Sequence, residues 1–248
     1  MATTVVNKYH KLPYDIYIGR GSDFGNPFSH LPDVDAIHVE NREEACDMHL
    51  SWIFGQRHLL ARLKELKGKV LCCYCHPARC HGHTLAQLAD TTWWKDDKII
   101  LECSSKGDIR YSAFGAEVEV FGKRRATIEE HYQLSKRFMT KDREVFTPNS
   151  IYDIKGKNSK TKNMDFCWIE VNGVTFPVEW RMEFYKMMWL MYLDDNPDLV
   201  EYASRFDDYN DIFKGRSEIC QADCIRQYIK EGRQSMENDV AEFRRLIK

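Results

Sequence analysis

The sequence lacks the features of a membrane or exported protein. No apolar run approaches the roughly 20 residues that a helix needs to cross a bilayer. The N-terminal stretch Met1-Ala2-Thr3-Thr4 has no basic segment followed by an apolar one, as a secretory signal would have. We therefore expect a cytoplasmic protein with no membrane partner.

The chain also lacks a strong charge of either sign and a regular set of cysteines. Its formal net charge is -2, so no global basic field points to a nucleic-acid partner, although a local basic groove is compatible with this balance. The nine cysteines are an odd number, and those outside one short cluster have no regular spacing. This argues against a disulfide framework and favours free or metal-bound thiols in a reducing compartment.

What is present is the composition of a globular protein with one large domain or two small ones. The 248 residues are 43% hydrophobic and 30% charged, a balance that supports a folded core and argues against intrinsic disorder. We find no internal repeat and no low-complexity tract.

The first part of the chain alternates strand, loop and helix patterns. Residues 14–18 alternate in polarity and predict a short strand, which leads into a glycine-rich loop at 19–28. Apolar residues at helical spacing predict a helix over 42–66, followed by a buried strand over 69–75 and a helix over 81–88. This order is typical of a small α/β unit, in which ligands bind at the carboxyl ends of the strands.

The second part of the chain is expected to be mainly helical. We place a domain boundary in residues 96–107, where a short apolar run ends in a Ser-Ser-Lys-Gly turn. This gives a small α/β domain over 1–95, followed by a mainly helical α+β domain over 107–248. The fold class of the whole chain is therefore α+β.

The elements predicted for the second domain begin with a strand at 118–122 that turns at a glycine. A helix over 127–139 follows, and the polar, lysine-rich segment 147–163 lacks periodicity and is expected to be an exposed loop. The rest of the domain is predicted to form helices at 180–192, 198–205 and 220–233.

A cluster of cysteines and histidines follows the second predicted strand. Seven potential metal ligands fall within residues 72–83, and zinc takes four such ligands in a tetrahedron. In the alternative interpretation the thiols are inert residues of a buried strand, with Cys73 and Cys75 on one face and Cys72 on the other. We expect no required cofactor and keep zinc as the open alternative. The candidate zinc ligands are Cys72, Cys75, Cys80 and either His81 or His83.

The first part of the chain resembles a small domain of unassigned function found in phage and bacterial proteins. The resemblance covers about the first third of the chain and does not supply a chemistry. Physically, Arg20 beside glycines, with Asn26 in the turn that follows, suits an anion such as phosphate. An internal carboxylate is the alternative partner for Arg20. The motifs that carry the resemblance are Gly19-Arg20, Gly25-Asn26-Pro27-Phe28, Cys73-Tyr74-Cys75 and Cys80-His81-Gly82.

The helix predicted after Gly122 carries an unusual polar face. Its start, Thr127-Ile128-Glu129-Glu130, has the Thr-x-x-Glu pattern of a capping box. By helical spacing, Glu130 and His131 point away from this face. The face is either a solvated surface with a Glu-to-Lys contact or part of a functional site. The side chains that share the face are Glu129, Tyr132, Gln133 and Lys136.

This helix and its flanking segments resemble the NADAR family over most of residues 107–233. Two departures stand out, because Ala113 occupies the place of an Asn and Glu130 the place of a His. The matching segments are Tyr111-Ser112-Ala113-Phe114, the strand that turns at Gly122, the helix with Glu129, Tyr132, Gln133 and Lys136, then Trp180, Asn196-Pro197-Asp198-Leu199, and more loosely Asp211-Ile212-Phe213-Lys214-Gly215.

The resemblance implies an N-glycosidase. Some NADAR proteins are similar to enzymes that cleave riboflavin-pathway intermediates, and others remove ADP-ribose from guanine bases in DNA. Breaking a sugar–nitrogen bond builds positive charge on the sugar, which a carboxylate stabilises while activating water. The resemblance makes Glu129 the central catalytic carboxylate and Asp211 a second one. Implied substrate-binding residues are Tyr132, Gln133, Lys136, Ser112, Phe114 and Trp180.

The substrate is left open by the two departures from the family pattern. We favour a modified or ADP-ribosylated base in DNA, because an added domain and two basic segments have no evident purpose with a small metabolite. The basic segments Lys123–Arg125 and Lys155–Lys162 would follow the DNA backbone, unless they are only solvated surface. The alternatives are a hydrolase of a free nucleotide or ADP-ribose-type metabolite, and a non-catalytic module that binds ADP-ribose or a modified nucleotide. The sequence does not give the oligomeric state.

Overall fold

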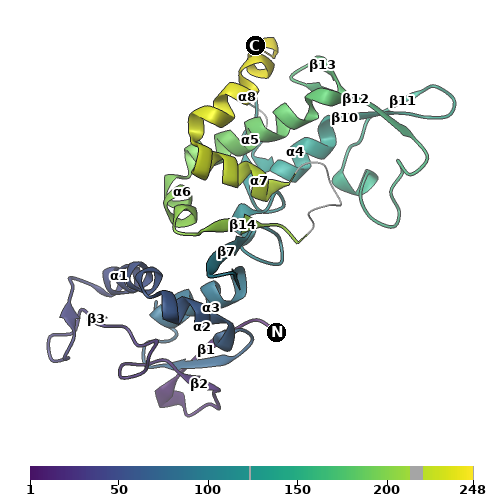
Figure 1. Cartoon of the computed structure of the whole chain (residues 1–248). Helices are drawn as coiled ribbons and strands as arrows, with labels where there is room; N and C mark the ends of the chain where they lie inside the picture. Colours follow the sequence, from purple (N-terminus) through teal and green to yellow (C-terminus); the bar gives the residue numbers. More distant parts are fainter. Residues whose placement is uncertain (123, 213–219, 248) are drawn as a thin grey trace. The chain divides into compact units, whose positions relative to one another are not determined.

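The computed structural model of the chain describes residues 1–122, 124–212 and 220–247 (Figure 1). It divides into two compact units, Met1–Leu101 and Glu102–Lys248. Helices and small sheets occur in both units, so the α+β fold class predicted from the sequence is confirmed. No helix of the described residues is long and apolar enough to cross a membrane.

A three-stranded parallel sheet of order β1-β5-β2 forms the base of the first unit. The middle strand β5 (Val70–Cys73) pairs with β1 (Thr4–Asn7) on one edge and with β2 (Ile16–Tyr17) on the other. Parallel neighbours need crossover connections, which the helices of this unit supply. The sequence-predicted strand over 69–75 is shorter in the structure, because the chain leaves the sheet after Cys73.

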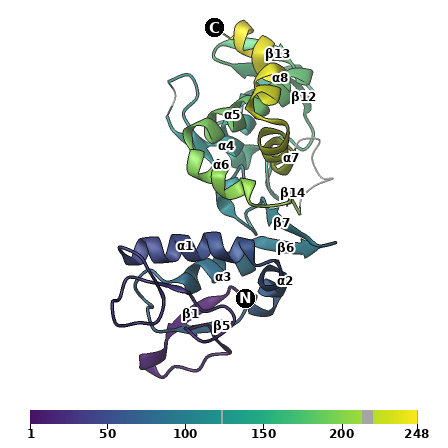
Figure 2. The same ribbon diagram turned by 60° about the vertical axis from the view of Figure 1, so that its left-hand side comes forward.

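Three helices cover this sheet (Figure 2). Helix α3 (His81–Thr91) packs on β1 and β5, and α1 (Arg42–Gly55) and α2 (Arg57–Leu66) pack on α3. The prediction of one helix over 42–66 is wrong, because Gln56 leaves the helical conformation with φ -102° and ψ 74°. The break allows the leucines of α2 to be buried separately from α1; these are Leu59, Leu60, Leu63 and Leu66.

The glycine-rich loop of the first unit requires close backbone approach. A Cβ atom at Gly25 would lie 2.8 Å from the carbonyl oxygen of Gly19, so a side chain there would displace the loop. The smaller pieces of this unit are the parallel pair β3 (Phe28–Ser29) and β4 (Ile37–His38), the antiparallel pair β6 (Thr92–Lys95) and β7 (Lys98–Glu102), and the 3-10 helix η1 (Lys8–His10).

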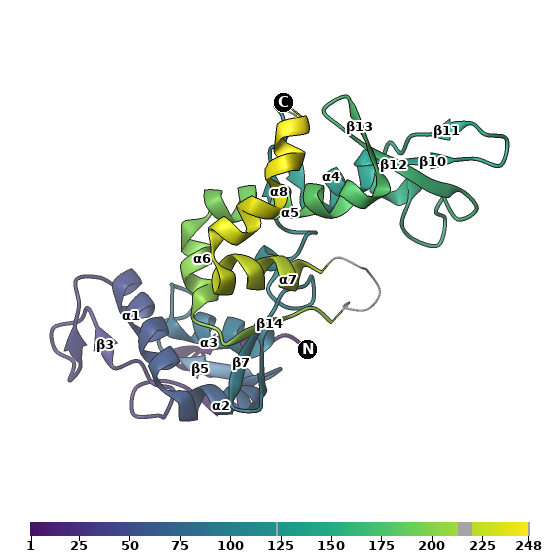
Figure 3. The same ribbon diagram turned by 45° about the horizontal axis from the view of Figure 1, so that its top comes forward.

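The second unit is organised around helix α5 (Arg181–Asp195). Aromatic and methionine side chains are buried on most sides of this helix, as expected for an element at the centre of a core. Helices α4 (Ile128–Ser135) and α8 (Arg233–Leu246) pack against it (Figures 1 and 3). The shorter helices α6 (Pro197–Ser204) and α7 (Gln221–Arg226) also contact α5.

An antiparallel sheet of order β11-β10-β12-β13 extends from α4 (Figure 3). Strand β10 (Lys136–Met139) lies between β11 (Val145–Phe146) and β12 (Asp165–Val171), and β12 pairs with β13 (Val174–Pro177). The turn between β12 and β13 is Asn172-Gly173, with φ of 52° and 77°. Two successive positive φ angles at Asn-Gly are characteristic of a tight two-residue hairpin.

The predicted helix over 127–139 extends four residues too far at its C-terminal end. Lys136 adopts φ -70° and ψ 145° and begins strand β10, opposite Ile169 of β12. Lys136 therefore does not lie on the helix that carries Glu129. Pairing with two neighbouring strands satisfies the backbone of residues 136–139 and overrides their local helical pattern.

The other departures from the predicted elements are also local. The region 220–233 divides into α7, a π-helix η5 (Gln227–Glu231) and the start of α8, with Gly232 at φ 95° before α8. The loop 147–163 contains a 3-10 helix η3 (Ile151–Asp153) with a capping box. The remaining elements are the pair β8 (Glu117–Val118) and β9 (Ala126–Thr127), the strand β14 (Asp208–Asn210), and the 3-10 helices η2 (Ile109–Tyr111) and η4 (Val178–Trp180).

Helix α4 depends on its N-terminal cap. The Thr127 hydroxyl accepts a hydrogen bond from the backbone N–H of Glu130 at 3.1 Å. We expect Thr127→Ala to lower the free energy of unfolding by about 1 kcal/mol, as measured by urea denaturation. Thr127→Ser keeps the hydroxyl and should remain close to the wild type. Equal losses in the two variants would show that the cap is not the stabilising contact.

Candidate active site

Glu129 is held at the buried start of α4. Its backbone N–H donates to the carbonyl oxygen of Ala113 at 2.9 Å, which attaches the helix start to the segment around Ser112 and Phe114. The residue is only 6% exposed, so its carboxylate lies within the fold rather than on a solvated face. A buried carboxylate requires compensation by hydrogen bonds or an opposite charge.

Two side chains provide this compensation. Gln133, one turn along α4, donates from Nε2 to Glu129 Oε1 at 2.9 Å. The Lys155 ammonium forms an ion pair with the same oxygen and also lies 4.8 Å from the ring centroid of Phe114. Among the described residues, both of these polar contacts of the carboxylate are made by Oε1.

Lys136 and Tyr132 form a second part of the site. The Lys136 ammonium lies 4.2 Å from the ring centroid of Tyr132, in cation–π geometry. Burial lowers the pKa of Lys136 to about 8, an effect that the charge of Glu129 opposes and the charges of Lys155 and Arg181 reinforce. Burial also raises the pKa of Tyr132 to about 12, so this phenol stays protonated and able to donate a hydrogen bond.

A layer of hydrogen bonds behind these residues joins four segments of the second unit. The ring of Tyr185 packs edge-on against Tyr132, with ring centroids 5.3 Å apart, and its hydroxyl donates to Gln221 Oε1 at 3.4 Å. The same oxygen accepts from the N–H of Ala113 at 3.3 Å, while Gln221 Nε2 donates to the carbonyl of Cys103 at 2.6 Å. Gln221 therefore fixes the segment on which the start of α4 rests.

The remaining residues predicted for this site lie in different surroundings. Ser112 is fully buried, and its hydroxyl accepts from the N–H of Phe114 at 3.3 Å. Trp180 packs with Phe243 in a stacked arrangement, with ring centroids 5.9 Å apart, which is a packing role. Asp211 is buried and accepts from the thiol of Cys220 at 3.6 Å. The residues Phe213, Lys214 and Gly215 of the same motif lie outside the described residues.

The two basic segments are largely engaged in ion pairs. Besides Lys155 with Glu129, Lys160 pairs with Asp153 at 2.7 Å. In the other segment, Arg124 pairs with Glu130 and Arg125 with Glu117, while Lys123 lies outside the described residues. The charges assigned from the sequence to a DNA-binding track thus mostly face carboxylates of the same chain.

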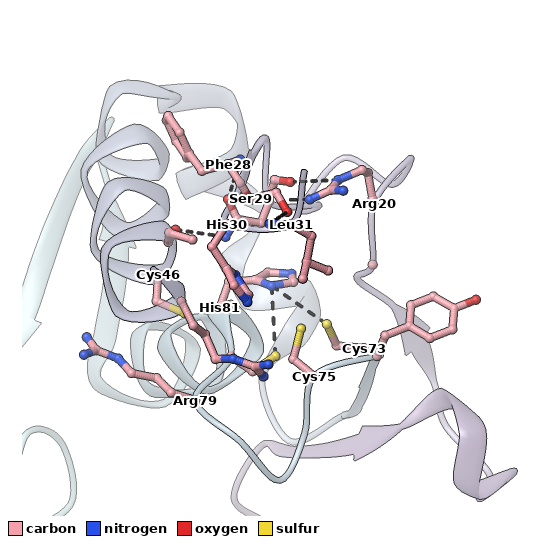
Figure 4. Close-up of a pocket in the computed structure, with 16 residues that line it drawn as sticks. Arg20, Phe28, Ser29, His30, Leu31, Cys46, Cys73, Cys75, Arg79 and His81 are labelled. Atoms are coloured by element: carbon pink, nitrogen blue, oxygen red, sulfur yellow. Dashed lines mark hydrogen bonds between the residues drawn. The ribbon is translucent and has the colours of Figure 1, made fainter. Parts of the chain in front are cut away.

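The first unit contains a separate cavity of about 240 Å³ (Figure 4). Arg20 lines it and donates to the carbonyl oxygen of Phe28 at 3.4 Å; among the described residues it pairs with no carboxylate. Asn26 holds the loop together, because it donates to the carbonyl of Ala45 and accepts from the N–H of Phe28. Asn26 therefore has a structural role in the cavity wall.

The cysteine and histidine cluster opens into this cavity. The ligand atoms of Cys73, Cys80 and His81 lie within 4.8 Å of one another. Cys72 was named as a candidate zinc ligand, but the structure places Cys73 beside His81 instead. Adjacent side chains of β5 point to opposite faces of the sheet, so Cys72 lies on the other face.

Sequence reasoning missed two residues of the Glu129 site. Lys155 was assigned to a DNA-binding track, because its lysine-rich, non-periodic segment carries no signal for a contact 26 positions back along the chain. Tyr185 falls within the helix predicted over 180–192 and was given no role in the site, although its side chain connects Tyr132 to Gln221. The identity of a tyrosine within a run of aromatic residues gives no indication of its partner.

The ionisation of Lys136 should depend on Glu129. The charge of Glu129 raises the pKa of Lys136, so Glu129→Gln should move that pKa from about 8 to a lower value. Titration of the ¹⁵Nζ resonance, assigned with a Lys136→Arg variant, measures it directly. If the pKa of Lys136 is the same in the wild type and in Glu129→Gln, the two side chains are not coupled electrostatically.

Comparison with known families gives two matches. Residues 4–91 match a domain of unknown function, DUF4326, and residues 84–247 match the family described as DarT1-associated NADAR antitoxin. The matches confirm the two resemblances found in the sequence. No curated protein matches the chain. Because the second match covers more than half of the sequence, the chain belongs to the NADAR family of DarT1-associated antitoxins.

Proposed function

We propose that the second unit is an N-glycosidase that releases ADP-ribose from a modified base in DNA. NADAR domains are associated with N-glycosidase and ADP-ribose-hydrolase-like activity, which supports the reaction class. The antitoxin description of the matching family supports an enzyme that removes a modification added by a toxin. The appended first unit is compatible with a macromolecular substrate.

The observation that carries this proposal is the environment of the Glu129 carboxylate. It is buried, and it is fixed through Oε1 by Gln133 and Lys155. In the reaction, the bond between C1 of the ribose and the base nitrogen breaks, and the base leaves with the electron pair. Glu129 stabilises the cationic sugar and accepts a proton from the attacking water, whose oxygen forms the new bond to C1. This proton then passes to the nitrogen of the departing base, which returns Glu129 to its ionised form.

The charges around Glu129 suit an anionic substrate. Lys155 and Arg181 both lie close enough to Lys136 for their charges to lower its pKa. ADP-ribose carries a diphosphate, for which lysine and arginine are the usual partners. Because the pKa of Lys136 is about 8, this side chain is charged at neutral pH and loses its charge as the pH rises above that value. Tyr132 remains a hydrogen-bond donor for ribose hydroxyls over the same range.

One observation favours a smaller substrate as the second candidate. Four side chains of the basic segments pair with carboxylates of the same chain, which leaves fewer charges for a DNA backbone; they are Arg124, Arg125, Lys155 and Lys160. A free ADP-ribosylated nucleotide would need only the groups around Glu129 and no contact with a DNA backbone. Comparing hydrolysis of the same modified nucleotide inside an oligonucleotide and free in solution distinguishes the two candidates.

The decisive variant is Glu129→Gln, which removes the charge and keeps the shape. With an oligonucleotide that carries one ADP-ribosylated guanine, we expect the rate of ADP-ribose release to fall by about 10²- to 10⁴-fold. Mass spectrometry measures the released ADP-ribose and the restored base. Substrate binding, measured by fluorescence anisotropy, should persist in the variant because Lys155 and Arg181 are unchanged in it.

Each outcome of this comparison decides between the candidate functions. Full hydrolysis by Glu129→Gln would remove the carboxylate from the mechanism. Binding of the modified oligonucleotide without hydrolysis by the wild type would make the second unit a non-catalytic reader of ADP-ribose. Hydrolysis of the free nucleotide alone would assign the smaller substrate.

Lys155 should contribute to the rate of ADP-ribose release by holding the Glu129 carboxylate in place. Lys155→Gln removes the ion pair with Glu129, and since a charged hydrogen bond contributes about 1.5–3 kcal/mol, the rate should fall about 10- to 100-fold. Lys157→Gln is the matched control, because Lys157 is an exposed lysine of the same loop with no ion pair to Glu129. A comparable loss of rate in both variants would show that the loop acts through its overall charge.

A further inference from the structure

Three chemically suitable ligand atoms converge at the end of β5. Cys73 Sγ lies 3.8 Å from His81 Nδ1, and Cys80 Sγ lies 4.0 Å from the same nitrogen. In a tetrahedral zinc site, bonds of about 2.3 Å to sulfur and about 2.0 Å to nitrogen place these atoms about 3.5 Å apart. Each of the two sulfur–nitrogen distances therefore needs to shorten by about 0.5 Å or less when a zinc ion binds.

A fourth sulfur, that of Cys75, lies outside the three atoms that are within 4.8 Å of one another, and it would have to move toward them to complete a tetrahedron. Cys75 follows Cys73 by two residues, just after the end of β5, and it lines the same cavity as Cys73, Cys80 and His81. Figure 4 shows the sulfur of Cys75 beside that of Cys73, both directed toward the cavity in front of His81. The chain thus brings three thiols and one imidazole together from the end of a strand and the start of a helix.

The surroundings prepare these groups as metal ligands. His81 Nε2 lies 2.8 Å from the carbonyl oxygen of Ile18, an arrangement in which Nε2 carries the proton and Nδ1 presents its lone pair to the sulfurs. The backbone N–H of Gly82 donates to Cys80 Sγ at 3.3 Å. The ring of His49 packs against His81 with centroids 4.9 Å apart and fixes its orientation. Ligand-orienting contacts of this kind surround metal sites in proteins.

We propose that Cys73, Cys75, Cys80 and His81 bind a zinc ion. Three sulfur ligands and one imidazole select zinc over magnesium or calcium, which prefer oxygen. Four protein ligands close the tetrahedron, so the ion is structural: it joins the end of β5 to the start of α3 and holds the intervening loop, which forms one wall of the Arg20 cavity. The site belongs to the first unit and does not depend on the function proposed for the second.

Metal content measured on the full chain tests the proposal. We expect about one zinc per chain by inductively coupled plasma mass spectrometry, after expression with added zinc and purification without chelators. The double variant Cys75→Ser/Cys80→Ser should retain less than about one tenth of this amount. Cys46→Ser is the matched control, because Cys46 is a buried cysteine that lines the same cavity but lies outside the ligand group, and it should retain the full amount.

The absorption spectrum of the cobalt(II)-substituted protein reports the number of thiolate ligands, and it does so without the double variant. Cobalt(II) bound to three cysteines should show ligand-to-metal charge-transfer absorption that falls by about one third in Cys75→Ser, with the visible bands of a tetrahedral ion retained. Circular dichroism confirms that each variant is folded. The proposal is overturned if reduced wild-type protein takes up neither zinc nor cobalt, or if Cys75→Ser/Cys80→Ser binds as much zinc as the wild type.

Discussion

The second unit depends on the burial of one charge, the carboxylate of Glu129. Removing an ion of this kind from water costs several kcal/mol unless partners replace the lost hydration. Gln133 supplies one hydrogen bond from the same helix, and Lys155 supplies a positive charge from a distant loop. The start of α4, the segment around Ala113 and the loop carrying Lys155 must therefore occupy fixed positions together. Burial of a charged group at this desolvation cost is typical of functional sites, which is consistent with a catalytic role for Glu129.

The part of the site that could be predicted from the sequence is the part encoded within one helix. The i, i+4 spacing of Glu129 and Gln133 makes their contact a local consequence of helical geometry, and the Thr-x-x-Glu pattern correctly places the start of the helix. Lys136 was misplaced because helical spacing continues beyond Ser135, although strand pairing ends the helix there. The Asn172-Gly173 turn is a strong hairpin signal, but the prediction did not use it, so β12 and β13 were missed.

The contacts that could not be predicted are those between residues far apart in the chain. Nothing in the local composition around Lys155 indicates that it meets Glu129, since a lysine-rich loop is equally compatible with solvent or a phosphate backbone. In the first unit, one feature of the cysteine and histidine cluster could be predicted from the sequence and another could not. Alternation along β5 is enough to separate Cys72 from Cys73, whereas the distance to His81 required the packing of α3 on the sheet.

The hydrogen bonds of the Gln221 amide restrict which amino acids can replace glutamine at position 221. Its oxygen accepts hydrogen bonds from the Ala113 N–H and the Tyr185 hydroxyl, and its nitrogen donates to the carbonyl oxygen of Cys103. Glutamate has the right length but offers no N–H, and asparagine has the right groups but is one methylene shorter. Because the two backbone partners lie 108 and 118 residues away, a substitution is compatible with the fold only if both distant segments shift together. Sequence divergence among homologues should therefore leave residue 221 coupled to the segments around 103 and 113, even where the rest of α7 varies freely.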